Sequence, residues 1–274
     1  MQVKRITVVT ACKDASKRAL TTAASIVGQR AIESGRVSLQ YLVFDAGTDG
    51  TGALLKKEFG DAVEVRTEPD TGLYHAIAKG FRLADGEVVS YLNAGDVYHP
   101  SAFDIVADVM AAHDVRWLTG MQVLCNEALH VIKAAVPFRY RRDLLLKGLY
   151  GRRLPFLQQE ATFWARSLLA LVDLDVLASL RLAGDFYLWR CFAREEEPAI
   201  VAAYLGGFTL HPRPLSANID EYRREVESLA DPPDALDALR VRAERWRWRN
   251  LTNNARKRRN PRLFSWDVEE SRWR

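Results

Sequence analysis

Short apolar runs rich in β-branched residues alternate with longer amphipathic segments over the first 120 residues. The apolar runs predict strands at 5–10, 39–44, 63–67 and 87–92. The intervening segments place apolar residues at helical spacing and predict helices at 17–33, 54–59, 73–83 and 101–112. Strands that alternate with helices in this way indicate βαβ units. We therefore expect an α/β fold with a mainly parallel sheet flanked by helices.

The alternation weakens from Val123 onward. The later pattern predicts a strand at 158–164, a helix at 166–174, a helix that begins near Asp185, a strand at 199–204, a turn at 206–208 and a long helix at 235–258. No internal repeat or low-complexity linker interrupts these segments. The chain therefore reads as one domain with a helical C-terminal extension.

Polar residues follow each of the first four predicted strands. Carboxylates or amides come shortly after each strand, at Asp14, Asp45, Glu68, Asp70, Asn93 and Asp96. Any one of them is typical of a turn or a helix cap. Together, at the carboxyl edge of one parallel sheet, they predict a site for a divalent cation and sugar or ribose hydroxyls. The chain has neither GxGxxG nor GxxxxGK[ST], so a bound phosphate needs a metal to offset its charge.

Composition excludes several classes of protein. Among 274 residues, 48% are hydrophobic and 27% are charged, which argues against a disordered or fibrous chain. Cys12, Cys125 and Cys191 are widely spaced and predict a reducing compartment, without a disulfide framework or a zinc site. No apolar run reaches the roughly 18 residues of a membrane span, and charge follows the N-terminus too soon for a signal peptide. We expect a cytoplasmic protein.

Charge is unevenly distributed. Residues 235–274 hold twelve Lys and Arg against five Asp and Glu, which gives this segment a charge of about +7. Because the net charge of the chain is +4, the preceding residues carry about −3. A solvated helix face is the simplest interpretation. Arginines interleaved with Trp246 and Trp248 also suit peripheral contact with anionic lipid at the inner face of a membrane. A nucleic-acid partner is the third hypothesis, although no nucleic-acid-binding motif is present.

Three motifs occur in order: DAGTDGT at 45–51, EPDTGLYHAIAKG at 68–80 and YLNAGD at 91–96. In wording and order they resemble family 2 glycosyltransferases of GT-A fold, especially the bacterial enzymes that build exopolysaccharide, capsule or O-antigen. The resemblance implies a GT-A domain over 1–216, with a nucleotide-sugar half at 1–120 and an acceptor half at 121–216. Residues 217–274 then form a helical, basic extension.

The resemblance also assigns residues to the donor. The positions that match the family's nucleotide-sugar contacts are Thr10, Ala11, Asp45, Glu68, Asp70, Gly72, Lys79, Asn93 and Ala94. Asp96 stands at the last position of the DxD-type motif, which holds Mg²⁺ or Mn²⁺ on the donor diphosphate. Asn93 and Gly95 replace two acids of the fuller motif, so the diphosphate and water would complete the metal shell.

Asp185 stands where the family places its catalytic base, and a helix cap is the alternative role for it. Gln159, Glu160 and Trp164 match an acceptor segment, in which Gln159 and Glu160 replace the family's His-Gln pair. The implied activity is a hexosyltransferase-type transfer with inversion from a nucleotide sugar, by the family's habit a UDP-sugar, to a hydroxyl of a glycan or a lipid-linked acceptor. A catalytically silent relative that binds a nucleotide sugar or a partner is the alternative.

Overall fold

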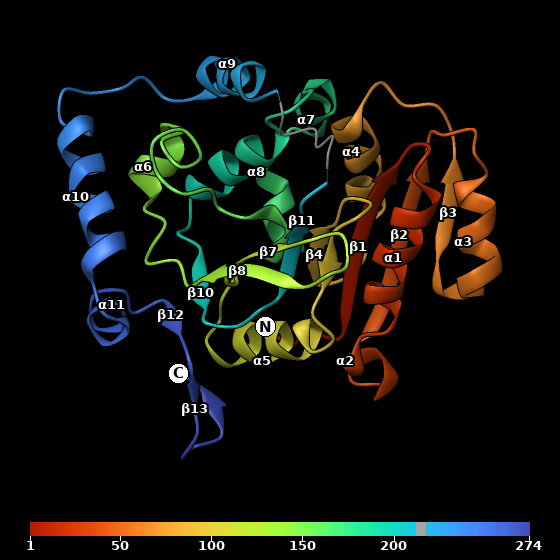
Figure 1. Cartoon of the computed structure of the whole chain (residues 1–274), viewed down its shortest axis with the longest axis horizontal. Helices are drawn as coiled ribbons and strands as arrows, with labels where there is room; N and C mark the ends of the chain where they lie inside the picture. The colour runs from red at the N-terminus through yellow and green to blue at the C-terminus, as the bar shows by residue number, and fades with distance from the viewer. Residues whose placement is uncertain (212–217) are drawn as a thin grey trace.

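A computed structural model describes residues 1–211 and 218–274 (Figure 1). Its central layer is an eight-stranded sheet in the order β12-β10-β6-β9-β4-β1-β2-β3. The strands are β1 (Arg5–Cys12), β2 (Ser38–Asp45), β3 (Glu64–Thr67), β4 (Val88–Tyr91), β6 (Trp117–Thr119), β9 (Thr162–Ala165), β10 (Ala199–Val201) and β12 (Leu263–Phe264). Neighbours pair in parallel except where β9 runs antiparallel to β4 and β6. The predicted α/β fold with a mainly parallel sheet is therefore confirmed.

A smaller sheet lies beside the central one, in the order β5-β11-β7-β8. Its strands are β5 (Val97–Tyr98), β11 (Gly206–Thr209), β7 (Gln122–Cys125) and β8 (Val131–Ala135), and a separate hairpin pairs β13 (Trp266–Asp267) with β14 (Arg272–Trp273). The turn predicted at 206–208 is wrong, because these residues form β11. A Cβ on Gly206 would collide with the backbone carbonyl of Glu160, so glycine lets this strand pass close to that residue.

Helices cover both faces of the central sheet (Figure 1). They are α1 (Ser16–Val27), α2 (Arg30–Glu33), α3 (Thr51–Phe59), α4 (Leu73–Leu83), α5 (Ala102–Ala112), α6 (Arg142–Leu146), α7 (Leu174–Ser179), α8 (Gly184–Ala193), α9 (Ile219–Leu229), α10 (Asp237–Asn250) and α11 (Asn253–Arg259). Three short 3₁₀ helices are η1 (Gly60–Ala62), η2 (Gln159–Ala161) and η3 (Arg166–Leu171).

Three of the predicted helices are each divided in the structure. The helix predicted at 17–33 ends at Gly28, and α2 starts two residues later. The segment at 166–174 forms η3, and α7 follows once Asp173 accepts hydrogen bonds from the first N–H groups of that helix. The helix predicted at 235–258 breaks after Asn250, where the Thr252 side chain caps α11. In each case a local cap or glycine outweighs the periodic pattern.

The core lies on both faces of the central sheet. Along β1, Ile6 and Val8 belong to a cluster with α1 and α5, whereas Val9 and Ala11 belong to a cluster with α4 and α8. This alternation follows from the two-residue period of a strand. The strand is thus covered on both sides, as a central parallel strand must be.

The C-terminal segment joins this body. Val241 of α10 belongs to the same cluster as α4 and α8, and Trp248 packs on the rings of Tyr140 and Tyr150. Beyond α11, β12 pairs with β10 and extends the central sheet. None of the described helices combines the length and the hydropathy of a membrane span.

Candidate functional site

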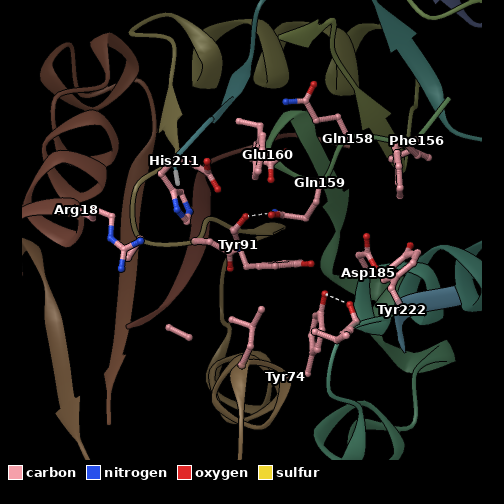
Figure 2. Close-up of a pocket in the computed structure, with 18 of the residues that line it drawn as sticks. Arg18, Tyr74, Tyr91, Phe156, Gln158, Gln159, Glu160, Asp185, His211 and Tyr222 are labelled. Atoms are coloured by element: carbon pink, nitrogen blue, oxygen red, sulfur yellow. Dashed lines mark hydrogen bonds between the residues drawn. The ribbon is translucent and has the colours of Figure 1, made fainter. Parts of the chain in front are cut away.

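A cavity of about 950 Å³ opens at the carboxyl ends of β1 and β4. The smaller sheet, η2, the start of α8 and α9 form its other sides (Figure 2). Nine of the residues predicted from the sequence line it: Ala11, Asp70, Gly72, Asn93, Ala94, Asp96, Gln159, Glu160 and Asp185. Residues from widely separated segments therefore meet in one place, at the strand ends where a ligand was expected.

Thr10 and Asp45 do not line the cavity. The Thr10 side chain is fully buried and accepts a hydrogen bond from the Tyr41 hydroxyl. The buried Asp45 carboxylate accepts hydrogen bonds from Gly47 N at 2.9 Å and from Gly52 N at 2.8 Å. It therefore organises its own loop and the start of α3.

Glu68, Lys79 and Trp164 also lie outside the lining. Lys79 forms an ion pair with Glu68 at 2.9 Å and donates to the Pro69 carbonyl, so both charges are engaged beside the loop that follows β3. Trp164 has no exposed surface and packs edge-on against Phe81 in the core. Its ring supports the cavity wall from within the core and cannot touch an acceptor in this conformation.

Two buried acids share one side of the cavity. Asp96 accepts a hydrogen bond from Thr209 N at 2.8 Å, which ties the strand exit of β4 to β11. Burial and the neighbouring charge of Glu160 raise the pKa of Asp96 well above its usual value. Burial also raises the pKa of Glu160. Two carboxyls in such surroundings favour binding of a proton or a cation between them.

Two amide oxygens that face this region have no hydrogen-bond partner among the described residues, Asn93 Oδ1 and Gln159 Oε1. The Gln159 amide nitrogen, in contrast, donates to the Tyr91 carbonyl (Figure 2). Because buried polar atoms are rarely left unpaired, these oxygens point to a ligand that supplies donors or positive charge.

Two residues that the sequence interpretation missed, Arg18 and His211, lie together on one side of the cavity (Figure 2). Arg18 comes from α1 and packs along the Gly95 turn. Burial and the charge of Arg18 lower the pKa of His211, so its ring is neutral near pH 7 and can offer a lone pair. Neither residue is part of a motif, and only the approach of α1 and β11 brings them to the site.

Asp185 lies on the other side of the cavity, beside Tyr222 (Figure 2). It is in the first turn of α8 and is partly exposed to the cavity. Burial raises its pKa to about 6, while a hydrogen bond from Phe186 N at 2.7 Å and the nearby Tyr222 hydroxyl act in the opposite direction. A carboxylate with such a pKa is suited to take a proton near neutral pH.

Asp185 does not cap α8. The residue at the N-cap position is Ala183, and the cap has no side-chain hydrogen bond. Instead Glu225 of α9 accepts from the backbone N–H groups of Arg181, Leu182 and Ala183. Glu225, 40 positions away, therefore satisfies the N–H groups that lead into α8, while the Asp185 side chain accepts from Phe186 N in its first turn.

The part of the cavity next to Asp185 carries aromatic rings. Phe156 and Tyr222 have ring centroids 6.0 Å apart, and Phe156 is 45% exposed. Lys133 of β8 and Gln158 line the same cavity. Rings next to polar groups are typical of surfaces that bind sugars, since the ring covers the apolar face of a pyranose.

The site fits a divalent cation in part. Asp96 offers a carboxylate, which suits both Mg²⁺ and Mn²⁺, and His211 offers a neutral imidazole, which suits Mn²⁺ better than Mg²⁺. Within residues 1–211 and 218–274, no three His, Cys, Asp or Glu side chains converge as a complete metal site. A cation held here would therefore need further oxygen ligands from a diphosphate and water.

The fold has relatives among solved structures. Residues 1–349 of TarS from S. aureus superpose with a TM-score of 0.62 at 14% identity, over 91% of this chain and 74% of that fragment. Its complex with UDP-GlcNAc gives 0.61 at 10% identity, over 92% and 69%. Mannosyltransferase PcManGT from Pyrobaculum calidifontis, with GDP-Man and Mn²⁺, gives 0.56 at 15% identity, over 90% and 70%. These likenesses confirm the predicted GT-A type of fold.

No curated protein sequence matches the chain. A family model does, that described as Glycosyl transferase family 2, and its match covers residues 7–159, just over half of the chain. The match includes the strand exits that border the cavity and ends at Gln159, before Asp185 and α9. The chain belongs to glycosyl transferase family 2.

Proposed function

We propose that this protein transfers a sugar from a nucleotide-sugar donor to a hydroxyl group of a glycan or lipid-linked acceptor, with inversion at the anomeric carbon. The observation that carries the proposal is that one cavity is lined by Asp96 and Asp185, and that Arg18 and His211 lie on one side of it while Asp185 and Tyr222 lie on the other (Figure 2). In this arrangement one end of the cavity suits a departing diphosphate, and the other end suits an incoming hydroxyl.

Asp185 acts as the general base in this proposal. As the acceptor oxygen forms its bond to the anomeric carbon, the bond from that carbon to the diphosphate oxygen breaks. The hydroxyl proton passes to the Asp185 carboxylate. A pKa of about 6 leaves Asp185 ionised near pH 7, yet basic enough to accept the proton.

In this proposal the charge on the leaving diphosphate is neutralised by groups on the Asp96 side of the cavity. Asp96 and His211 would hold Mg²⁺ or Mn²⁺, which when bound neutralises charge on the diphosphate. Arg18 supplies a second positive charge from the protein itself and acts next to the Gly95 turn, where the motif lacks an acid. In this proposal Asn93 Oδ1, which has no partner among the described residues, accepts from a donor hydroxyl.

The nucleoside lies in this proposal between the end of β1 and the loop after β3, against Ala11, Asp70, Gly72 and Ala94. Thr10, Asp45, Glu68 and Lys79 lie outside the lining and in this proposal shape the segments that border the donor. Because the neighbouring fold is found with UDP-GlcNAc in TarS and with GDP-Man in PcManGT, the fold alone does not select a nucleotide. We propose a UDP-hexose, in line with the resemblance to polysaccharide-building enzymes.

Gln159 and Glu160 face the acceptor in this proposal, and Phe156 and Tyr222 offer ring surfaces to it. Trp164 supports that wall from the core.

The proposal is tested by calorimetry of UDP, GDP, CMP and dTDP with and without Mn²⁺, on the native protein, Asp96→Ala and Arg18→Gln. We expect one nucleoside diphosphate to bind, and its affinity to fall about tenfold or more without metal and in each variant, since each change removes a close charge interaction worth about 1.4 kcal/mol or more. Arg66→Gln, an exposed arginine on β3, is the matched control for Arg18. Absence of binding by every nucleotide would refute a transferase function.

The outer face of α10 supports a peripheral position at an anionic membrane. The two acids of this helix, Asp237 and Glu244, are buried against the body, where they pair with Lys147 and Arg247. The exposed face of the helix is left with apolar and cationic side chains, namely Leu239, Arg242, Arg245, Trp246 and Arg249. Exposed tryptophan among arginines is typical of helices that lie on phospholipid headgroups. We therefore propose a cytoplasmic protein that contacts the inner leaflet.

Vesicles of phosphatidylglycerol and phosphatidylcholine test this part of the proposal by co-sedimentation. Truncation would remove β12 from the central sheet, so point variants are needed. We expect the double variant Arg242→Glu and Arg249→Glu to lose most of its binding, because each polybasic side chain contributes about 1 kcal/mol. Arg66→Glu is the control, and equal binding by all three proteins would exclude α10 as the contact.

A further inference from the structure

The segment that leads into α8 is held from both sides. On one side the Glu225 carboxylate accepts from three consecutive N–H groups, those of Arg181 at 2.8 Å, Leu182 at 2.7 Å and Ala183 at 2.6 Å. On the other side the Tyr74 hydroxyl donates to the Leu182 carbonyl at 3.2 Å (Figure 2). Because these groups belong to the backbone just before Asp185, they set where α8 begins.

Glu225 also provides the negative charge that the start of a helix favours. With those backbone donors satisfied from α9, Asp185 accepts only the adjacent Phe186 N–H from the backbone around it. Gly184 contributes as well, since a Cβ at this position would collide with the Tyr74 ring. The carboxyl group of Asp185 is therefore left on the cavity side of the helix.

The same face of α9 reaches the Asp185 side chain. Tyr222 lies three residues before Glu225, so both project from one side of the helix. Val226 anchors this face in a small cluster with Ala183 and Phe186, the residues on either side of Gly184 and Asp185. Tyr222 lines the cavity with its ring beside Asp185 (Figure 2), and its hydroxyl lowers the pKa of that carboxyl group.

We propose that Tyr222 and Glu225 are positioning residues for Asp185: Glu225 fixes the backbone that presents this carboxylate, and Tyr222 holds its oxygen in the cavity. The inference rests on the proposed role of Asp185 as base. It adds that the base is completed by α9, a helix outside the residues 7–159 that match the family. Tyr222 and Glu225 act through Asp185 and take no part in bond making.

The two side chains have opposite electrostatic effects on Asp185. The negative charge of Glu225 raises the pKa of Asp185, whereas the hydrogen bond from Tyr222 lowers it. Three further groups face Asp185, and its charge raises the pKa of each: Tyr74 of α4, Tyr91 of β4 and Glu160 of η2. They are unchanged in the variants below, so they do not alter the comparison.

The experiment measures the Asp185 pKa directly, by carbon-13 NMR of the full chain labelled at aspartate carboxyls, with Asp185→Asn identifying the signal. We expect Tyr222→Phe to raise this pKa and Glu225→Gln to lower it, each by about half a unit or more, since a lost hydrogen bond and a lost negative charge act in these opposite directions. Glu221→Gln is the matched control, because Glu221 is on the same helix and pairs only with the side chain of Arg181.

Shifts in the same direction, or none in either variant, would overturn the inference. Thermal unfolding is recorded beside each titration, and Glu225→Asp, which keeps the charge, is expected to restore the native pKa if Glu225→Gln alters packing. Because the titration needs no substrate, its result is independent of transferase activity. A catalytically active Asp185→Asn would refute the proposed function, whereas unshifted titrations with an inactive Asp185→Asn would refute only the roles of α9.

Discussion

The two sides of the cavity are built in different ways. On the proposed donor side, Ala11 lies near the end of β1, Asp70 and Asn93 lie in the loops after β3 and β4, and the Asp70 carboxylate accepts from Gly72 N two residues away. On the proposed acceptor side, the backbone before Asp185 is held by Glu225 and Tyr74, which are 40 and 111 positions distant from it. The difference teaches that local turns can place the proposed donor contacts, while the proposed base requires long-range packing.

The largest expected effect separates the base from the donor site. Asp185→Asn keeps the size of the side chain but cannot accept the acceptor proton, so we expect kcat to fall about 10²–10⁴-fold. Binding of the nucleotide found by calorimetry should stay within about twofold, because Asp185 lies away from Arg18 and His211 (Figure 2).

Asp175→Asn is the control for this change, since Asp175 is also in the first turn of a helix but is 92% exposed and pairs with Arg82. A drop in nucleotide affinity as large as the drop in kcat would mean that the two sides of the cavity are not functionally distinct.

An intermediate effect is expected for Asp45, a motif residue whose carboxylate stabilises the fold. Asp45→Ala leaves one buried and one partly buried N–H group without an acceptor, and we expect the free energy of unfolding to fall by about 2–4 kcal/mol. Urea denaturation measures it, with Asp61→Ala as control because Asp61 is fully exposed. Unchanged stability together with lost nucleotide binding would instead assign Asp45 a direct donor contact.

The smallest effect concerns pH. Burial raises the pKa of Asp185 from 3.8 to about 6, so the folded protein holds more protons than the unfolded chain between about pH 4 and pH 7. This contribution makes stability fall as pH rises through that window. We expect Asp185→Asn to gain stability relative to the native protein over the same window, by about 1–2 kcal/mol. Thermal unfolding at a series of pH values measures it, and two parallel curves would contradict a raised pKa.

The strand exits were identified from the sequence because they depend on short-range rules. An apolar run followed by Asp, Asn and Gly predicts both the strand and the polar turn, and Asp70, Asn93 and Asp96 are found at the cavity accordingly. The same rules led to Asp45, which stands at the end of β2 but whose carboxylate accepts hydrogen bonds from its own loop and from the start of α3. Position after a strand is local, but the direction of a side chain depends on its neighbours.

Four other residues near the cavity were not identified from the sequence, because their positions depend on long-range packing: Arg18, His211, Tyr222 and Glu225. Arg18, Tyr222 and Glu225 stand in segments predicted only as helical, His211 follows a segment predicted as a turn, and none belongs to a motif. Trp164 shows the converse, since an aromatic residue in a motif-like segment is buried completely once β9 is enclosed between β4 and β6. Burial is a property of the packed sheet and cannot be assigned to a residue in isolation.

The sequence by itself determined the α/β class, the parallel strands and the edge at which the cavity opens, because these follow from periodicity and turn chemistry within a few residues. Only the tertiary structure decided which acids reach the cavity, which backbone groups they accept from and which cations stand near them. The physical reason is that hydrogen bonding and desolvation, which set the direction and the pKa of a carboxyl group, come from atoms brought together by packing. Glu225 and Asp185 lie 40 residues apart in the chain, and the docking of α9 on α8 makes them parts of one site.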